Sequence, residues 1–76
     1  MINAYILGQI SPNTEKATVD QLNNINGVQE AHIVFGKFDI IAKISADTEE
    51  ILNTTILDKV RQIPELVKTQ TLLVAE

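Results

Sequence analysis

The chain has 76 residues, no cysteine, and ten acidic against six basic side chains, which gives a formal net charge of −4 at pH 7. These numbers exclude a disulfide framework and a thiolate metal site, and an acidic chain with singly scattered bases is a poor match for direct DNA binding. Because hydrophobic residues make up 45% of the chain, residues 1–76 are expected to fold as one domain, so small that oligomerisation is a common source of added stability.

The first elements are expected to be a strand and a helix. Side chains alternate over residues 2–10, which predicts a strand that Ser11 and Pro12 end. Ser11 as N-cap and Pro12 at the first helical position predict a helix over residues 12–24. Its apolar face is expected to contain Thr18, Val19, Leu22 and Ile25. Gly27 lies where glycine commonly follows the end of a helix.

A β-hairpin is predicted in the middle of the chain. Two apolar, β-branched segments, residues 28–35 and 38–45, flank the dipeptide Gly36-Lys37. Glycine supplies the positive φ angle that a tight reversal requires. The turn also keeps an acidic residue, Asp39, beside a glycine whose neighbouring N–H groups can be exposed. This hairpin is therefore the first candidate for a binding site.

A second helix and a last strand complete the chain. Asp47 and Glu50 have the spacing of a capping box and predict the helix start. The buried side of this helix is expected to contain Ile51, Leu52, Thr55, Ile56, Val60 and Ile63. Pro64 ends the helix because the residue before a proline avoids helical conformation. Residues 67–75 are predicted to form the last strand.

The expected order β-α-β-β-α-β repeats with an offset of half the chain, so that Ile2, Ala4 and Ile6 correspond to Ile40, Ala42 and Ile44. This order predicts an α+β, ferredoxin-like fold. Its four-stranded antiparallel sheet carries both helices on one face. The same six residues are expected to pack against the helices.

The other sheet face is expected to form a dimer interface. A sheet face in contact with water would be polar. The residues that alternate with those facing the helices are nevertheless mostly apolar, which indicates an interface. The residues predicted for this interface are Tyr5, Leu7, His32, Val34, Ile41, Leu72 and Val74. Lys43, like His32, is a polar exception on this face. We therefore predict a dimer formed by packing two sheets face to face.

Few residues suggest catalysis. His32 is the only histidine and has no candidate partner for a nucleophile pair, so it is interpreted as a sheet-face residue. No Asp-x-Asp or His-x-x-Glu spacing indicates a metal site, and no cofactor is expected. No apolar run approaches the roughly 20 residues of a membrane helix, and no signal peptide is recognised, so a cytoplasmic protein is expected.

The segment from Val34 to Ile41 resembles a hairpin motif, V-x-G-x-[YF]-D followed by apolar residues. That motif belongs to the effector-binding domain of Lrp/AsnC-type transcription regulators, often called the RAM domain. Two further segments are similar to this family. They are Ile25-Asn26-Gly27-Val28 before the second strand and residues 68–74, which resemble its T-x-T strand.

The resemblance implies a non-catalytic domain that dimerises through its sheet and assembles further, typically as a ring of four dimers. It implies that an amino acid binds in clefts between dimers. The residues that would line the cleft are Gly36, Lys37, Phe38, Asp39, Thr69 and Thr71. The chain begins at the first strand, so it is expected to lack the helix-turn-helix domain and not to bind DNA. Co-assembly with full-length Lrp/AsnC-type regulators would then link it to amino-acid-responsive transcription.

Two other functions are kept as alternatives. One is a dimeric α+β barrel enzyme of the small oxygenase or isomerase type, in which His32 would be the residue to suspect. Such an enzyme needs a cavity between sheet and helices, and this chain fills its sheet with aliphatic residues. The other is a structural oligomerisation module with a vestigial pocket.

Overall fold

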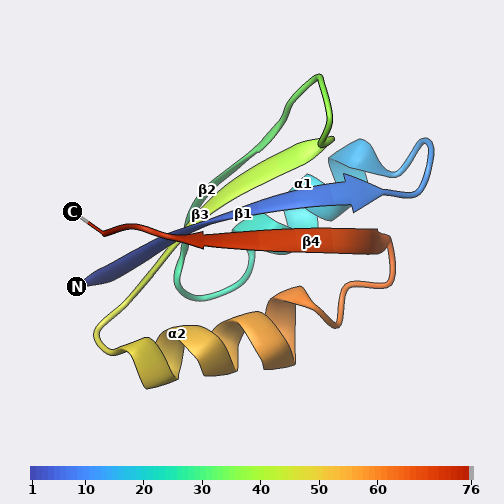
Figure 1. Ribbon diagram of the computed structural model, residues 1–76. Helices are drawn as coiled ribbons and strands as arrows, with labels where there is room; N and C mark the ends of the chain where they lie inside the picture. The colour runs from blue at the N-terminus through green and yellow to red at the C-terminus, as the bar shows by residue number, and fades with distance from the viewer. Residues whose placement is uncertain (76) are drawn as a thin grey trace.

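The computed structural model describes residues 1–75, so the last residue of the expected domain 1–76 lies outside the described residues (Figure 1). The elements in chain order are β1 (Ile2–Ile10), α1 (Glu15–Asn23), β2 (Val28–Ile33), β3 (Ile40–Ala46), α2 (Glu49–Thr55), a π-helical turn η1 (Ile56–Val60) and β4 (Leu66–Leu73). The predicted order β-α-β-β-α-β is confirmed, with η1 as an addition to the second helix.

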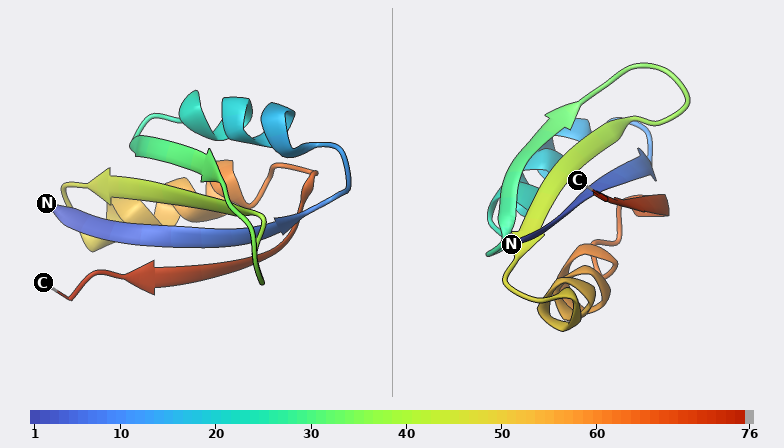
Figure 2. Two further views of the ribbon diagram at one scale, coloured as in Figure 1. Left: turned by 90° about the horizontal axis from the view of Figure 1, so that it is seen from above. Right: turned by 60° about the vertical axis from the view of Figure 1, so that its left-hand side comes forward.

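The four strands form one antiparallel sheet in the order β2-β3-β1-β4. β3 lies between β1 and β2, as a split βαβ unit requires, and both helices lie on the same side of the sheet (Figure 2). The predicted ferredoxin-like fold is therefore confirmed. Within residues 1–75, no helix has the length and apolarity needed to cross a membrane.

The core lies between the sheet and the two helices. All six residues predicted to face the helices do so: Ala4, Ile6, Ile40, Ala42 and Ile44 are at most 3% exposed, and Ile2 packs against them. The helices contribute Leu22, Leu52 and Val60, each at most 1% exposed. Leu22 and Val60 are equivalent positions of the two half-chains, so the weak sequence repeat corresponds to a repeat in the packing.

Helix α1 begins later than predicted. Ser11 and Pro12 do not start the helix, because Asn13 adopts a left-handed conformation (φ 65°) that separates them from Glu15. The N-cap residue is Thr14, whose hydroxyl donates to the carbonyl of Ser11 (2.6 Å) instead of capping the helix. The predicted apolar face is nevertheless confirmed: Thr18 and Leu22 are buried, and Val19 and Ile25 pack against the core.

The start of α2 is shifted by one residue from the prediction. The side chain of Thr48, and not that of Asp47, caps the helix by accepting a hydrogen bond from the Ile51 N–H (3.1 Å). Leu52 is buried, whereas Ile51 is 51% exposed, so its predicted burial was wrong. One residue corresponds to about 100° around a helix, which turns Ile51 away from the sheet.

The turn η1 was not predicted. The N–H of Arg61 donates to the carbonyl of Ile56 (2.9 Å), five residues back, where an α-helix would use four. Ile56 and Val60 remain buried, so the wider turn keeps the core contacts. The helix ends at Val60, before the position at which Pro64 was expected to end it.

The predicted hairpin strands are also shorter in the structure. β2 ends at Ile33 and β3 starts at Ile40, so the tight turn at Gly36 becomes a loop of residues 34–39. This loop extends beyond the sheet (Figure 1). The last strand begins at Leu66, one residue before the predicted start, and ends at Leu73, two residues before the predicted end. One feature of the predicted turn is confirmed, because Gly36 has a positive φ angle (130°).

Candidate functional site

The sheet face that points away from the helices, called the outer face below, has an apolar centre. Leu7 lies opposite Ile41, and Tyr5 lies opposite Leu72, all alternating with the buried residues of the same strands. Tyr5 and Leu72 are 37% and 47% exposed, while Leu7 and Ile41 are half-buried. Both helices lie on the other side of the sheet (Figure 2), so they do not cover this surface.

The other three residues predicted for the outer face lie at its margins. His32 lies opposite Ile41. Val74 follows the end of β4 and is 37% exposed; its N–H donates to the Asn3 carbonyl (2.9 Å). Val34 follows the end of β2 and is half-buried. The register thus places Tyr5, Leu7, His32, Ile41 and Leu72 on the outer face, while Val34 and Val74 lie just beyond the strand ends.

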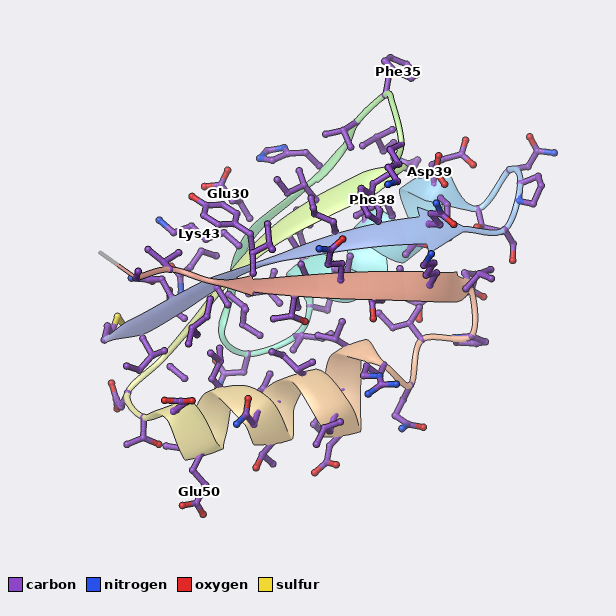
Figure 3. The ribbon with its side chains drawn as sticks, viewed as in Figure 1. Glu30, Phe35, Phe38, Asp39, Lys43 and Glu50 are labelled. Atoms are coloured by element: carbon purple, nitrogen blue, oxygen red, sulfur yellow. The ribbon has the colours of Figure 1, made fainter. Side chains whose placement is uncertain are left out.

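A small polar cluster occupies the β2 side of the outer face. The His32 Nε2 lies 2.8 Å from the Glu30 Oε1, and both side chains are more than half exposed. Lys43 lies opposite Glu30 on the neighbouring strand (Figure 3). Residues two apart in a strand share a face, so the spacing of Glu30 and His32 was a signal that the sequence interpretation missed. His32 is therefore engaged with a carboxylate on its own strand.

The loop of residues 34–39 is held in place by hydrogen bonds at both of its ends. The Val34 N–H donates to the Asp39 carbonyl (2.8 Å), which closes the loop. The Asp39 N–H donates to the carbonyl of Gly8 (2.8 Å), and the Gln9 side-chain amide donates to the Lys37 carbonyl (3.1 Å). The end of β1 thus supports the loop, although it lies about 30 residues away in sequence.

Asp39 lies at the base of this loop with one carboxylate oxygen already in use. Its Oδ2 accepts a hydrogen bond from the backbone N–H of Ile10 (3.1 Å), beside a register shift in the pairing of β1 with β4. The side chain is only half-buried, so it can accept further hydrogen bonds. Asp39 therefore fixes the loop to β1 and still presents a negative charge.

The tip of the loop is open to solvent. Phe35 is fully exposed and points away from the sheet (Figure 3). A Cβ built on Gly36 would meet nothing within 4 Å, and Lys37 is exposed as well. Phe38 is half-buried. The structure therefore brings Gly36, Lys37, Phe38 and Asp39 together on one supported loop, with an exposed aromatic ring that the sequence interpretation did not select.

Thr69 and Thr71 lie apart from that loop. They pair with Gly8 and Ile6 of β1, both of which face the helices, and Thr69 is half-buried while Thr71 is exposed. β1 lies between these threonines and the strand that continues from Asp39. The two threonines thus belong to the other edge of the sheet from the loop.

Among residues 1–75, no three His, Asp or Glu side chains gather as a metal site. A depression of about 490 Å³ on the helix side lies between the end of α1 and the second helix. It is lined by Asn24, Ile25, Asn26, Thr54, Thr55, Asp58 and Lys59. None of these residues belongs to the predicted site. The supported loop at the edge of the sheet and the outer face remain the features that match the sequence analysis.

A ferredoxin-like sheet with an uncovered apolar face and a supported, exposed loop defines a class of small α+β binding domains. The chain belongs to the Lrp/AsnC ligand binding domain family, whose sequence pattern matches residues 3–76. This membership confirms the family that the hairpin motif and the T-x-T strand indicated.

The chain is similar to an uncharacterised HTH-type transcriptional regulator of Pyrococcus horikoshii, with 32% identity over 73 residues, covering 92% of this chain and 49% of that protein. It thus spans about half the length of the curated relatives it matches. A crystal structure of a hypothetical protein from Pyrococcus horikoshii has a TM-score of 0.94 and 32% identity, covering 100% of this chain and 92% of that one. A Neisseria meningitidis transcriptional regulator in complex with L-Met shares the fold, with a TM-score of 0.86 and 13% identity over 99% of this chain and 50% of that one.

Proposed function

We propose that this chain is a non-catalytic, oligomeric sensor domain that binds an amino acid at the loop of residues 34–39. The observation that carries the proposal is the support of this loop by β1, which presents Asp39 and the open backbone at Gly36 in a fixed arrangement. A carboxylate can accept from an α-ammonium group, and exposed backbone N–H groups can donate to an α-carboxylate. A preorganised loop also loses less conformational entropy on binding.

The ligand class is supported by the family and by one of its members. The matching family is described as a ligand-binding domain. The Neisseria meningitidis regulator of the same fold was solved with L-Met, which is an α-amino acid. For this chain we propose an amino acid without naming its side chain. The residues that would contact the ligand are those selected from the sequence: Gly36, Lys37, Phe38, Asp39, Thr69 and Thr71.

The unit of assembly would be a dimer formed through the outer face. Support comes from the apolar centre of that face, since two copies that packed there would remove Tyr5, Leu7, Ile41 and Leu72 from water. His32, Val34 and Val74 would lie at the margins. Residues 1–76 would act as one such domain in each copy.

The complete ligand site would need a second dimer. Thr69 and Thr71 lie on β4, and β1 lies between them and the strand that follows the loop, so the two groups of predicted ligand residues come from different parts of the sheet. As the family resemblance implies, threonines from a neighbouring dimer would complete a cleft begun by the loop. A ring of four dimers is the assembly that the family resemblance implies, and we retain it as part of the proposal.

Regulation of transcription would follow from co-assembly. The curated relatives are HTH-type transcriptional regulators. A full-length regulator with an equivalent outer face and loop could form mixed assemblies with this chain in the cytoplasm. Amino acid binding to this chain would then change the activity of that regulator. A binding role agrees with the description of the matching family as a ligand binding domain.

Thermal shift measurements of the purified protein with each of the twenty amino acids test the proposal. A ligand at 100 times its Kd raises the stability by about 2.7 kcal/mol. We expect at least one amino acid to raise the melting temperature of the wild type, and we expect the Asp39→Asn variant to lose this increase. Asp20→Asn is the matched control, because Asp20 is exposed on α1, away from the loop. Absence of a shift with every amino acid at millimolar concentration would contradict the sensor function.

The second candidate is a structural module with a vestigial pocket. The hydrogen bond from Ile10 to Asp39 favours it, because this bond gives Asp39 a structural role that requires no ligand. Under this alternative, Asp39→Ala would leave amino acid affinity unchanged. If the chain is a sensor, Asp39→Ala would weaken amino acid binding, as Asp39→Asn would.

A further inference from the structure

The polar cluster on the β2 side of the outer face contains the single histidine of the chain. Histidine is the side chain whose charge ordinarily changes between about pH 5 and 8. The His32 Nε2 lies 2.8 Å from the Glu30 Oε1, and Lys43 lies opposite Glu30 on β3 (Figure 3). One carboxylate therefore has two basic neighbours, of which one is charged throughout the physiological range and the other gains its charge as the pH falls.

The charged side chains of the sheet all lie on the outer face. Of the described residues that form strands, only Glu30, Lys43 and Lys68 carry a formal charge when His32 is neutral. Lys43 lies opposite Glu30, and Lys68 is four residues from Leu72 on the same strand, so strand alternation gives all three the same face. The outer face thus holds one acidic and two basic side chains, and protonation of His32 adds a third positive charge.

Packing two outer faces together would increase the cost of this added charge. In one copy the side chains of His32 and Glu30 are more than half exposed, so water screens their charges. A charge that loses water at an interface needs a partner, and like charges brought together oppose association. The carboxylate of Glu30 already faces Lys43. The nearest other acid, Asp39, lies beyond the end of β3 with its carboxylate bonded to the Ile10 N–H.

We propose that protonation of His32 weakens the dimer, so that assembly through the outer face depends on pH. This inference rests on the proposed dimer and adds a second input to it, separate from amino acid binding at the loop. A symmetric dimer contains the cluster twice, so protonation adds two positive charges to one interface. The state that binds fewer protons is favoured as the pH rises. The dimer is therefore stabilised above the pH range in which His32 titrates, and it loses this stabilisation as the pH falls through that range.

Sedimentation equilibrium of the full chain at constant ionic strength, without any amino acid, tests the inference. The dissociation constant of the dimer is measured at several pH values across the range in which histidine titrates. Because each dimer contains two histidines, we expect the Kd to rise by at least about tenfold from about pH 7.5 to about pH 5.5. Circular dichroism at each pH checks that the chain stays folded. A Kd that stays constant, or that falls with the pH, would overturn the inference while leaving the dimer intact.

Two substitutions at the same exposed position imitate the two charge states of the histidine. His32→Gln is neutral at every pH, and we expect its Kd to stay at the wild-type value of about pH 7.5 throughout the range. His32→Lys is charged throughout, and we expect it to dimerise at least about tenfold more weakly than His32→Gln at every pH.

Asn53→Lys is the matched control, because it adds the same charge to an exposed position of α2, on the other side of the sheet. We expect its Kd and its pH dependence to equal those of the wild type. A pH dependence that persists in His32→Gln, or an equal loss of affinity in His32→Lys and Asn53→Lys, would refute the role of His32. A wild type that is monomeric at every pH would contradict the proposed dimer and this inference together.

Discussion

At the scale of single residues, Asp39 shows how one side chain can serve both the fold and a site. Its Oδ2 accepts the Ile10 N–H, and the backbone of the same residue bonds to Gly8 and Val34. These contacts hold the loop of residues 34–39 against β1. The carboxylate is half-buried and still reaches solvent. Its structural and binding contributions can therefore be separated by choosing the substitution.

Asp39→Asn and Asp39→Ala are predicted to differ in stability. Asparagine keeps an oxygen that can accept the Ile10 N–H, so we expect little change in the free energy of unfolding. Alanine leaves that N–H without its partner, which should cost about 1–2 kcal/mol. Urea denaturation monitored by circular dichroism measures both. Equal stabilities of the two variants would show that the bond to Ile10 contributes nothing.

At the scale of elements, the second helix is defined by a cap and a wide turn. Thr48 caps its start, and η1 alters its end while Leu52, Ile56 and Val60 stay buried. Ile51 is exposed and Leu52 is buried, because neighbouring residues of a helix point about 100° apart. Only one of the two can therefore join the core.

Thr48→Ala is predicted to destabilise the protein, and Asp47→Ala is the matched control. Loss of the Thr48 cap should reduce the free energy of unfolding by about 1 kcal/mol. Asp47 makes no capping bond, so its substitution should change stability by less than about 0.5 kcal/mol. Chemical denaturation of the two variants beside the wild type gives the comparison. A larger loss for Asp47→Ala would restore the capping box expected from the sequence.

The strands were predictable because their side chains alternate with a period of two. Ile2, Ala4 and Ile6 therefore identified the core face without any structural information. Local sequence was not enough for the loop, since Gln9 and Ile10 support Lys37 and Asp39 through contacts about 30 residues apart. The separation of Asp39 from Thr69 likewise depends on strand order, which a motif match does not contain.

At the scale of the whole molecule, the two faces of the sheet have different environments. One face packs against both helices and contains the core. The outer face is apolar at its centre and polar beside β2, where Glu30, His32 and Lys43 gather. A domain of this size gains much of its stability from any further burial, because its own core is small. The outer face is therefore the surface on which oligomerisation should depend.

Leu72→Glu is predicted to convert the proposed dimer into a folded monomer. Leu72 lies on the outer face, and a charge there would be buried without a partner in a face-to-face dimer. Leu57→Glu is a close control, because Leu57 has similar exposure (51% against 47%) but lies in η1. Size-exclusion chromatography with light scattering gives the mass of each variant. A dilute wild type that is already monomeric, or a dimeric Leu72→Glu variant, would contradict this interface.

The pairing of β1 with β4 has a consequence for the rate of folding. Ala4 pairs with Leu73, so the β4 edge is completed only when nearly the entire chain has closed into a loop. Closing such a loop lowers the chain entropy before the stabilising hydrogen bonds form. Topologies dominated by distant contacts therefore fold more slowly than topologies with local contacts. The strand that carries Lys68, Thr69 and Thr71 is thus expected to be the last part of the sheet to form, long after the hairpin of β2 and β3.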